Sequence, residues 1–380
     1  MINTKSFVKI LNKHTNLITG VPDSLLKNFI TEIDKTFKGK HIISTNEGSS
    51  IGLAIGSYLS TSKPSVVYMQ NAGLGNAINP LISIADKKVY SIPMVLIIGW
   101  RGEILKNNKQ IKDEPQHIMQ GKNTINFIKN LNISYKIISN KTKNIDKVLK
   151  NIFFKSLKIS KPYALLVRKD TFQEVLPKKI KKKKYYIARE KVIEKVISSI
   201  PKNSVVVSTT GMISRELNEI RYNFGHKNID FVVVGGMGHA NQIASGIALN
   251  LPKKKIICLD GDGSLLMHLG SMVISSKYKN MLHILINNES HDSVGGQPTP
   301  VEKVDFSKIA KFCGYETTKS IISIKNISKT IKQSIKNKKS SFIEIICDKG
   351  HRNNLSRPDK NLNLRKIKFM RQINSKNKIK

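Results

Sequence analysis

The sequence is poor in acidic residues and has no long apolar run. Its 380 residues include 26 Asp and Glu against 65 Lys and Arg, so the formal net charge is +39. No apolar stretch reaches about 18 residues, the length needed for a membrane-spanning helix. The N-terminal segment lacks the apolar core and small-residue cleavage site of a signal peptide. We therefore expect a cytoplasmic protein that does not cross a membrane.

Cysteine is also scarce. The three cysteines, Cys258, Cys313 and Cys347, are an odd number, and the first and third lie in apolar, strand-like runs. Such positions favour reduced, buried thiols over a disulfide framework. This expectation agrees with a cytoplasmic location, where thiols stay reduced.

The positive charge raises the alternative of a basic nucleic-acid-binding protein without catalysis. The excess is mostly Lys, spread along the chain among many Asn and Ile, with dense blocks only at 178–184 and 365–380. Neither block interleaves aromatic residues in the pattern used to stack bases. We interpret the blocks as a solvated linker and tail, and expect no specific nucleic-acid partner.

Short apolar runs alternate with amphipathic stretches along both halves of the chain, which is typical of parallel sheets flanked by crossover helices. A charged, proline-marked stretch without an apolar period separates the halves. The sequence predicts two α/β domains of similar build, at 1–175 and 189–380, joined by a basic linker at 176–188 and ending in a basic tail. The expected strands are 17–19, 41–44, 65–69, 94–98, 163–167, 204–208, 231–234, 256–259, 282–286 and 342–347. The expected helices are 24–37, 47–59, 75–84, 189–200, 212–220, 239–249 and 265–275.

One motif in the second half carries a specific chemistry. The strand 256–259 runs directly into Asp260-Gly261-Asp262-Gly263, a helix follows, and the next strand ends at Asn287-Asn288. In open α/β sheets, ligands bind beyond the carboxyl ends of strands. A helix N-terminus offers free N–H groups to phosphate, and carboxylate, amide and carbonyl oxygens suit Mg²⁺. Gly-Asp-Gly or Asn-Asn alone is a common turn or strand end, but their combined order is far more specific.

This arrangement resembles the pyrophosphate-binding domain of thiamine-diphosphate enzymes. The resemblance implies thiamine diphosphate and Mg²⁺ as cofactors, with Asp262, Asn288 and the carbonyl of Ser290 as metal ligands. It also implies cofactor contacts from the neighbouring loops, made by Gly236, Met237, Gly238, His239, Gly261, Gly263 and Ser264.

The same resemblance requires a glutamate in the other domain, at a strand-to-helix junction. Glu47 occupies such a junction, followed by a run of small residues that allows close packing. A carboxyl group bonded to the aminopyrimidine ring of the cofactor favours the imino tautomer, which activates the cofactor. A lone Glu at a helix N-terminus is usually a surface residue that complements the helix dipole, so this assignment depends on the Gly-Asp-Gly motif.

Five further segments narrow the family: GVPDSL at 20–25, MQNAGLGNAINP at 69–80, GWRGEILKNNKQIKDEPQHIMQG at 99–121, GGMGHANQIASG at 235–246 and NNESHDSVGGQPT at 287–299. Together they resemble the phosphonopyruvate decarboxylase family, with the sulfopyruvate decarboxylases as the alternative. The resemblance implies decarboxylation of 3-phosphonopyruvate to phosphonoacetaldehyde and CO₂, within phosphonate biosynthesis. It also implies a homo-oligomer, at least a dimer, because in this superfamily the cofactor bridges two domain types across a subunit interface.

Further residues are candidates for proton transfer and substrate binding. Asp23 matches an acid position of related decarboxylases, and His117 and His291 are candidate proton carriers because His titrates near neutral pH. A phosphonate and a carboxylate need cations, for which the candidates are Arg101, Lys122, Arg352 and Arg357. The chain departs from the larger decarboxylases at Val294, where those enzymes carry a catalytic Glu, so the final proton must come from another group.

Overall fold

A computed structural model describes residues 1–105, 107, 109–176, 187–226, 229–356 and 361–374. The chain divides into two compact units, Met1–Lys181 and Lys182–Lys380. The predicted linker at 176–188 lies largely outside the described residues, so its structure remains a prediction. Among the described residues, no helix is long and apolar enough to cross a membrane.

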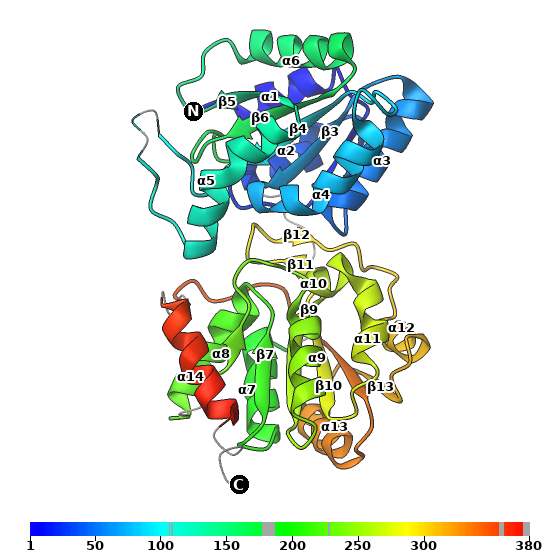
Figure 1. The fold of residues 1–380 in the computed structure, drawn as a ribbon, viewed down its shortest axis with the longest axis vertical. Helices are drawn as coiled ribbons and strands as arrows, with labels where there is room; N and C mark the ends of the chain where they lie inside the picture. Colours follow the sequence, from blue (N-terminus) through cyan, green and yellow to red (C-terminus); the bar gives the residue numbers. More distant parts are fainter. Residues whose placement is uncertain (106, 108, 177–186, 227–228, 357–360, 375–380) are drawn as a thin grey trace. The chain divides into compact units, whose positions relative to one another are not determined.

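The first unit is a six-stranded, fully parallel sheet in the order β2-β1-β3-β4-β6-β5, with helices on both faces (Figure 1). Its strands are β1 (Leu17–Gly20), β2 (Lys40–Ile43), β3 (Ser65–Gln70), β4 (Met94–Gly99), β5 (Ser134–Ile138) and β6 (Pro162–Val167). Its helices are α1 (Thr4–Leu11), α2 (Lys27–Thr36), α3 (Glu47–Thr61), α4 (Leu74–Pro80), α5 (Pro115–Asn130) and α6 (Ile145–Ile159).

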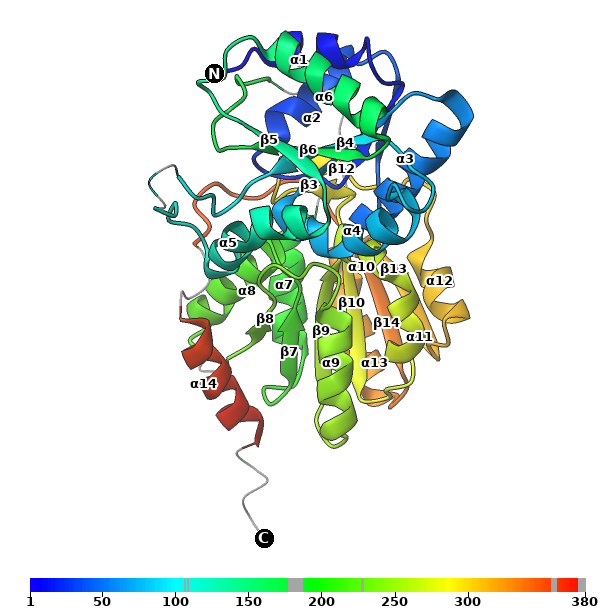
Figure 2. The ribbon, with the colours of Figure 1, turned by 45° about the horizontal axis from the view of Figure 1, so that its top comes forward.

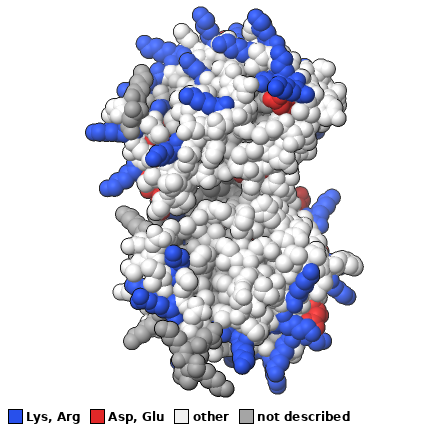
Figure 3. Space-filling view, viewed as in Figure 1, with Lys and Arg blue, Asp and Glu red and all other residues white. Residues whose placement is uncertain are grey.

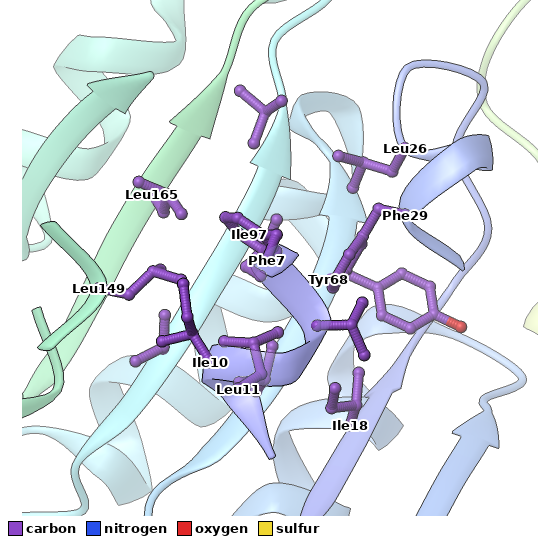
Figure 4. Close-up of a cluster of buried hydrophobic side chains, with 14 of the residues drawn as sticks. Phe7, Ile10, Leu11, Ile18, Leu26, Phe29, Tyr68, Ile97, Leu149 and Leu165 are labelled. Carbon is purple, nitrogen blue, oxygen red and sulfur yellow. The ribbon is translucent and has the colours of Figure 1, made fainter. Parts of the chain in front are cut away.

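The two faces of this sheet have separate cores. Helices α1, α2 and α6 pack on one face, where Phe7, Phe29 and Leu149 meet Ile18 and Ile97 of the strands (Figure 4). Helices α3, α4 and α5 cover the other face. Because β4 is buried along its whole length, it reads as a continuous apolar run, as central strands of parallel sheets do.

The second unit has the parallel order β13-β14-β10-β9-β7-β8. Its strands are β7 (Val205–Ser208), β8 (Phe231–Val232), β9 (Ile256–Gly261), β10 (Met281–Asn287), β13 (Thr317–Ile321) and β14 (Ser341–Ile346), and a small antiparallel hairpin is formed by β11 (Ser290–His291) and β12 (Gln297–Pro298). Its helices are α7 (Arg189–Ser199), α8 (Met212–Asn223), α9 (Ala240–Asn250), α10 (Asp262–Met267), α11 (Met272–Ser275), α12 (Phe306–Phe312), α13 (Ile324–Lys336) and α14 (Leu362–Asn374).

The helices of this unit also form two layers. Helices α7, α8 and α13 pack on one face of the sheet, and α9 to α12 cover the other (Figure 2). When the strands of each large sheet are numbered in chain order, both sheets have the same spatial order, with the second strand at one edge and the fifth at the other. The predicted fold class, two mainly parallel α/β domains, is confirmed, and the kinship of the halves is architectural.

The predicted elements differ from the observed ones in several respects, and five of the observed helices were not expected: α1, α5, α6, α12 and α13. The edge strands β5 and β13 were not expected, and the helix predicted at 265–275 is divided into α10, a short 3₁₀ turn (Leu269–Ser271) and α11. The expected solvated tail contains α14, which docks through buried Phe369 and through Arg365, whose guanidinium bonds to Asn218 of α8 (Figure 1). Within the predicted solvated tail at 365–380, residues 365–374 thus belong to a docked helix, although Lys366, Lys368 and Arg371 on it are exposed.

Candidate active site

The Gly-Asp-Gly motif lies at the carboxyl end of β9 in the second unit. Asp262 is the first residue of α10, and its side chain is buried. Burial raises the pKa of Asp262 to about 7, and a hydrogen bond donated by Thr299 Oγ1 opposes that rise. A carboxyl group buried in this way is a natural ligand for a cation, because a neighbouring positive charge compensates the lost hydration.

The two asparagines after β10 have different partners. Asn287 donates from Nδ2 to Glu344 Oε1 of β14 (2.9 Å), so its amide is used inside the sheet. Asn288 donates from Nδ2 to Asp292 Oδ2 (2.7 Å). Since its nitrogen faces Asp292, the amide oxygen of Asn288 is the atom directed elsewhere. The amide oxygen of Asn287 also accepts a hydrogen bond, from the N–H of Glu289 (3.2 Å), so Asn288 is the better candidate for a metal ligand.

The β11–β12 hairpin brings unsatisfied polar atoms to the same strand ends. Within the described part of the chain, Ser290 Oγ, His291 Nε2 and Gln297 Oε1 are buried without a hydrogen-bond partner. Buried polar atoms in native proteins are normally paired, so this cluster fits a polar ligand. Burial lowers the pKa of His291 to about 4, so its ring is neutral at physiological pH.

Ser264, one turn into α10, connects two other loops to the motif. Its hydroxyl oxygen accepts hydrogen bonds from the backbone N–H of Gly238 (3.1 Å) and from Thr209 Oγ1 (2.8 Å). The loop 236–239 is thus held beside Gly261, Asp262 and Gly263, in front of α9. The hard oxygen donors of Asp262 and Asn288 suit Mg²⁺, and the N-terminus of α10 suits a diphosphate. The residues present therefore fit both groups.

In the first unit, Glu47 begins α3 directly after β2. Its carboxyl group is buried and accepts a hydrogen bond from Asn76 Nδ2 (2.8 Å). Burial raises the pKa of Glu47. Gly73 makes this position possible, because a Cβ there would lie 2.4 Å from Glu47 Oε1. The segment 69–80 therefore provides both the space and a hydrogen-bond donor for the Glu47 side chain.

Asp23 is fully buried at the end of β1 in the same unit. Its Oδ1 accepts from Gln70 Nε2 (2.8 Å) and its Oδ2 from the N–H of Leu25 (3.1 Å). Burial raises the pKa of Asp23, and these hydrogen bonds together with Arg101 oppose the rise. The position combines a shielded acid with a nearby cation, as proton-transfer sites often do.

Asp113 links Arg101 and His117 into one cluster. Arg101 Nε donates to Asp113 Oδ2 (2.8 Å), and His117 Nδ1 lies 3.0 Å from Asp113 Oδ1. Burial would raise the pKa of Asp113, but its hydrogen bonds to Arg101 and His117 hold it below the usual range. Burial and then Arg101 lower the pKa of His117. The predicted residues Asp23, Arg101 and His117 therefore share one site in this unit.

The four predicted substrate cations have different surroundings. Arg101 donates to Asp113 and also to Ser24 Oγ (3.0 Å). Arg352 is paired with Glu190 and Glu219 on α7 and α8, and Lys122 is exposed on α5. Arg357 lies outside the described residues. Their roles in substrate binding remain predictions.

Several site residues were missed by the sequence reasoning. Asn76, Thr209, Thr299 and Asp292 bond to Glu47, Ser264, Asp262 and Asn288 respectively. Asn76 and Thr299 lie inside segments that carried the family resemblance, which was the available signal. Thr209 directly follows the first strand of the second unit, where a strand-end argument could have found it.

Two family models match the chain. The model described as "Thiamine pyrophosphate enzyme, N-terminal TPP binding domain" matches residues 3–122. The model described as "Thiamine pyrophosphate enzyme, C-terminal TPP binding domain" matches residues 209–345. These matches cover the strand ends that carry Glu47 and Asp262, and they define the class as a thiamine-pyrophosphate-dependent enzyme.

Curated relatives give the narrower assignment. The phosphonopyruvate decarboxylase of Streptomyces viridochromogenes is 28% identical, over 90% of this chain and 87% of its own length. The sulfopyruvate decarboxylase of Methanosarcina acetivorans is 24% identical over 93% of each. The sulfopyruvate decarboxylase subunit beta of Methanocaldococcus jannaschii is 33% identical over 42% of this chain and 82% of the subunit. The chain belongs to the thiamine pyrophosphate enzymes, as a decarboxylase of the phosphonopyruvate and sulfopyruvate type.

Proposed function

We propose that this protein decarboxylates 3-phosphonopyruvate to phosphonoacetaldehyde and CO₂, with thiamine diphosphate and Mg²⁺, as a step of phosphonate biosynthesis. The observation that carries the cofactor assignment is the cluster at the strand ends of the second unit, where buried Asp262 and Asn288 lie beside unsatisfied polar atoms. The substrate assignment is supported by the likeness to phosphonopyruvate decarboxylases over 90% of the chain.

In the second unit, Asp262, Asn288 and the backbone carbonyl of Ser290 would hold Mg²⁺. Gly236, Met237, Gly238, His239, Gly261, Gly263 and Ser264 would contact the diphosphate. His291 is neutral at physiological pH because of its burial. Its ring can therefore accept or donate a hydrogen bond without carrying charge.

In the first unit, Glu47 would activate the cofactor through its buried carboxyl group. Thiamine diphosphate supplies the electron sink for cleavage of the bond between the carboxylate carbon and the 2-oxo carbon. Because burial raises the pKa of Glu47, the protonated carboxyl group is favoured more than in an exposed Glu, and this form would donate a hydrogen bond to a ring nitrogen of the cofactor. Asp23 and His117 are the candidates for returning a proton to the product carbon, since Val294 cannot do so.

The substrate carries two anionic groups, so binding needs cations. Arg101 is the best placed of the three candidates that the structure describes, because it lies within the cluster of Asp23 and His117. Lys122, Arg352 and Arg357 remain further candidates. We also propose a homo-oligomer, at least a dimer, on the basis of the family resemblance.

The test is an assay of CO₂ release by purified protein. It compares 3-phosphonopyruvate with sulfopyruvate, each with and without thiamine diphosphate and Mg²⁺. We expect activity only with both cofactors, a higher kcat/KM for the phosphonate, and a loss of several orders of magnitude in Glu47→Gln. A Glu47→Gln protein that retains full activity would contradict the proposal.

Sulfopyruvate is the second candidate substrate. It is favoured by the 33% identity to a sulfopyruvate decarboxylase subunit beta and carries the same number of acidic groups. A kcat/KM that is higher for sulfopyruvate would select this function and leave the roles of Glu47, Asp262 and Asn288 unchanged.

A further inference from the structure

A buried charge network leads directly to Asn288. Arg189, at the start of α7, donates from Nε and Nη2 to the two carboxylate oxygens of Glu216 on α8 (2.8 and 2.9 Å). Its remaining nitrogen, Nη1, donates to Asp292 Oδ2 (2.7 Å). The side chains of Arg189, Glu216 and Asp292 are 4%, 2% and 7% exposed. These three side chains are shielded from water, so the geometry of their ion pairs is strongly fixed.

Asp292 collects three donors on one oxygen. Besides Arg189, the amide of Asn288 (2.7 Å) and the backbone N–H of Gly350 (2.9 Å) donate to Oδ2. A carboxylate accepts hydrogen bonds and has no hydrogen to donate. The Asp292 carboxylate therefore determines the orientation of the Asn288 amide, with its nitrogen toward Asp292 and its oxygen away from it. The backbone turns directly after Asn288, where Glu289 adopts a positive φ of 54°.

We propose that Asp292, held in place by Arg189 and Glu216, is a positioning residue for the metal site. It presents the Asn288 oxygen to the cation that Asp262 binds. The inference rests on the proposed function, because it requires a cation between Asp262 and Asn288. Ligands of a bound metal are commonly oriented by such outer hydrogen bonds, and loss of one reduces metal affinity by about 10- to 100-fold.

The principal test is direct titration of Mn²⁺ or Mg²⁺ into protein with thiamine diphosphate, by calorimetry or by the paramagnetic resonance of free Mn²⁺. Asp292→Asn has nearly the same shape but can present an N–H group to Asn288, so its amide is no longer held in one orientation. We expect a metal dissociation constant about 10- to 100-fold higher. The apparent KM for Mg²⁺ should rise accordingly, while kcat at saturating Mg²⁺ changes less.

A matched control separates positioning from stability. Asp230 forms an equally buried pair with Arg221 in the same unit, through both guanidinium nitrogens Nε and Nη2. Asp230→Asn should lower the melting temperature, as Asp292→Asn also should, yet leave the metal dissociation constant unchanged. Arg189→Lys is a second variant, since one ammonium cannot serve Glu216 and Asp292 with the same fork. It should also weaken metal binding.

The outcomes are distinguishable. If Asp262→Asn leaves metal binding intact, the proposed metal site is wrong, and this inference fails with it. If Asp262→Asn abolishes metal binding while folded Asp292→Asn and Arg189→Lys bind Mn²⁺ as tightly as wild type, only the positioning role is overturned. Should Asp292→Asn not fold, the Arg189→Lys titration alone decides.

Discussion

At the scale of single residues, Glu47 shows how a reactive group is held in place. Its carboxyl group is buried between Asn76, which donates to it, and Gly73, which leaves space for it. Burial favours the protonated carboxyl group over the carboxylate and so raises the pKa of Glu47. A neutral side chain at this buried position would stabilise the fold more than an acid does, because the acid must ionise without water around it. The site therefore carries a stability penalty at neutral and alkaline pH.

This penalty predicts a pH-dependent gain in stability on Glu47→Gln. A folded-state pKa above the unfolded value gives a contribution that is complete at low pH and lost as pH rises through the folded pKa. The cofactor-free variant should therefore melt higher than wild type at pH 8, by on the order of 2–4 °C for each kcal/mol relieved. The difference should shrink toward pH 5.

Thermal denaturation followed by circular dichroism measures this difference. Glu302→Gln, on an exposed position, is the control and should show no such pH trend. A Glu47→Gln protein that melts lower than wild type at pH 8 would show that ionised Glu47 stabilises the fold.

Glu47, Asp262 and Asn288 could be predicted from the sequence, and their hydrogen-bond partners could not. Glu47, Asp262 and Asn288 each lie at a strand end, which alternating apolar runs locate. Thr299 reaches Asp262 from 37 positions away, and Asn76 reaches Glu47 from 29. Such contacts depend on how loops return to the sheet, which local periodicity does not encode.

At the scale of elements, α5 is fixed to the loop after β4 by backbone contact. A Cβ on Gly121 would lie 1.9 Å from the carbonyl oxygen of Gly102. The indole of Trp100 donates to the Gly121 carbonyl (3.0 Å). Since α5 also carries His117, the close contact between Gly121 and Gly102 sets the distance between His117 and Asp113.

Gly121→Ala should therefore disturb both stability and chemistry. The methyl group meets backbone, which cannot rotate away, so α5 must shift, at a cost of about 1–3 kcal/mol. Urea denaturation measures the free energy of unfolding, and the CO₂ assay measures the accompanying fall in kcat/KM.

Asn126→Ala, on an exposed position of the same helix, is the matched control and should change stability by about 0.5 kcal/mol or less. An equally stable Gly121→Ala protein would mean that α5 can move outward without loss of packing.

The two strands of the large sheets that were missed from the sequence share a physical reason, which does not extend to the missed helices α1, α5, α6, α12 and α13. β5 and β13 are edge strands with mixed exposed and half-buried residues. Edge strands lack the continuous apolar run that made β4 and β10 recognisable. The helix predicted at 265–275 looked continuous because its apolar spacing continues through the turn at Leu269–Ser271.

At the scale of the whole molecule, the charge of +39 is dispersed. On the visible face, the described residues carry Lys and Arg at many separate positions without a continuous track of positive charge, while the basic block 178–184 lies outside the described residues (Figure 3). Dispersed charge attracts polyanions without fixing their orientation.

The protein should consequently bind duplex DNA only weakly and without sequence preference. We expect measurable binding at about 20 mM salt and its loss by about 200 mM, because released counterions drive such binding. Fluorescence anisotropy with two unrelated duplexes tests this. Sequence-selective binding that persists at the higher salt would revive the nucleic-acid-binding alternative.

The positions of certain lysines on the two sheets have a further consequence. Lys40 of β2, Lys136 of β5 and Lys319 of β13 are exposed on edge strands, and the remaining edge strand, β8, has only two residues. Open edges invite strands of other molecules to add to the sheet, and charged side chains or short strands discourage it. Repulsion between lysine-bearing edges would thus protect newly made chains from aggregating with one another.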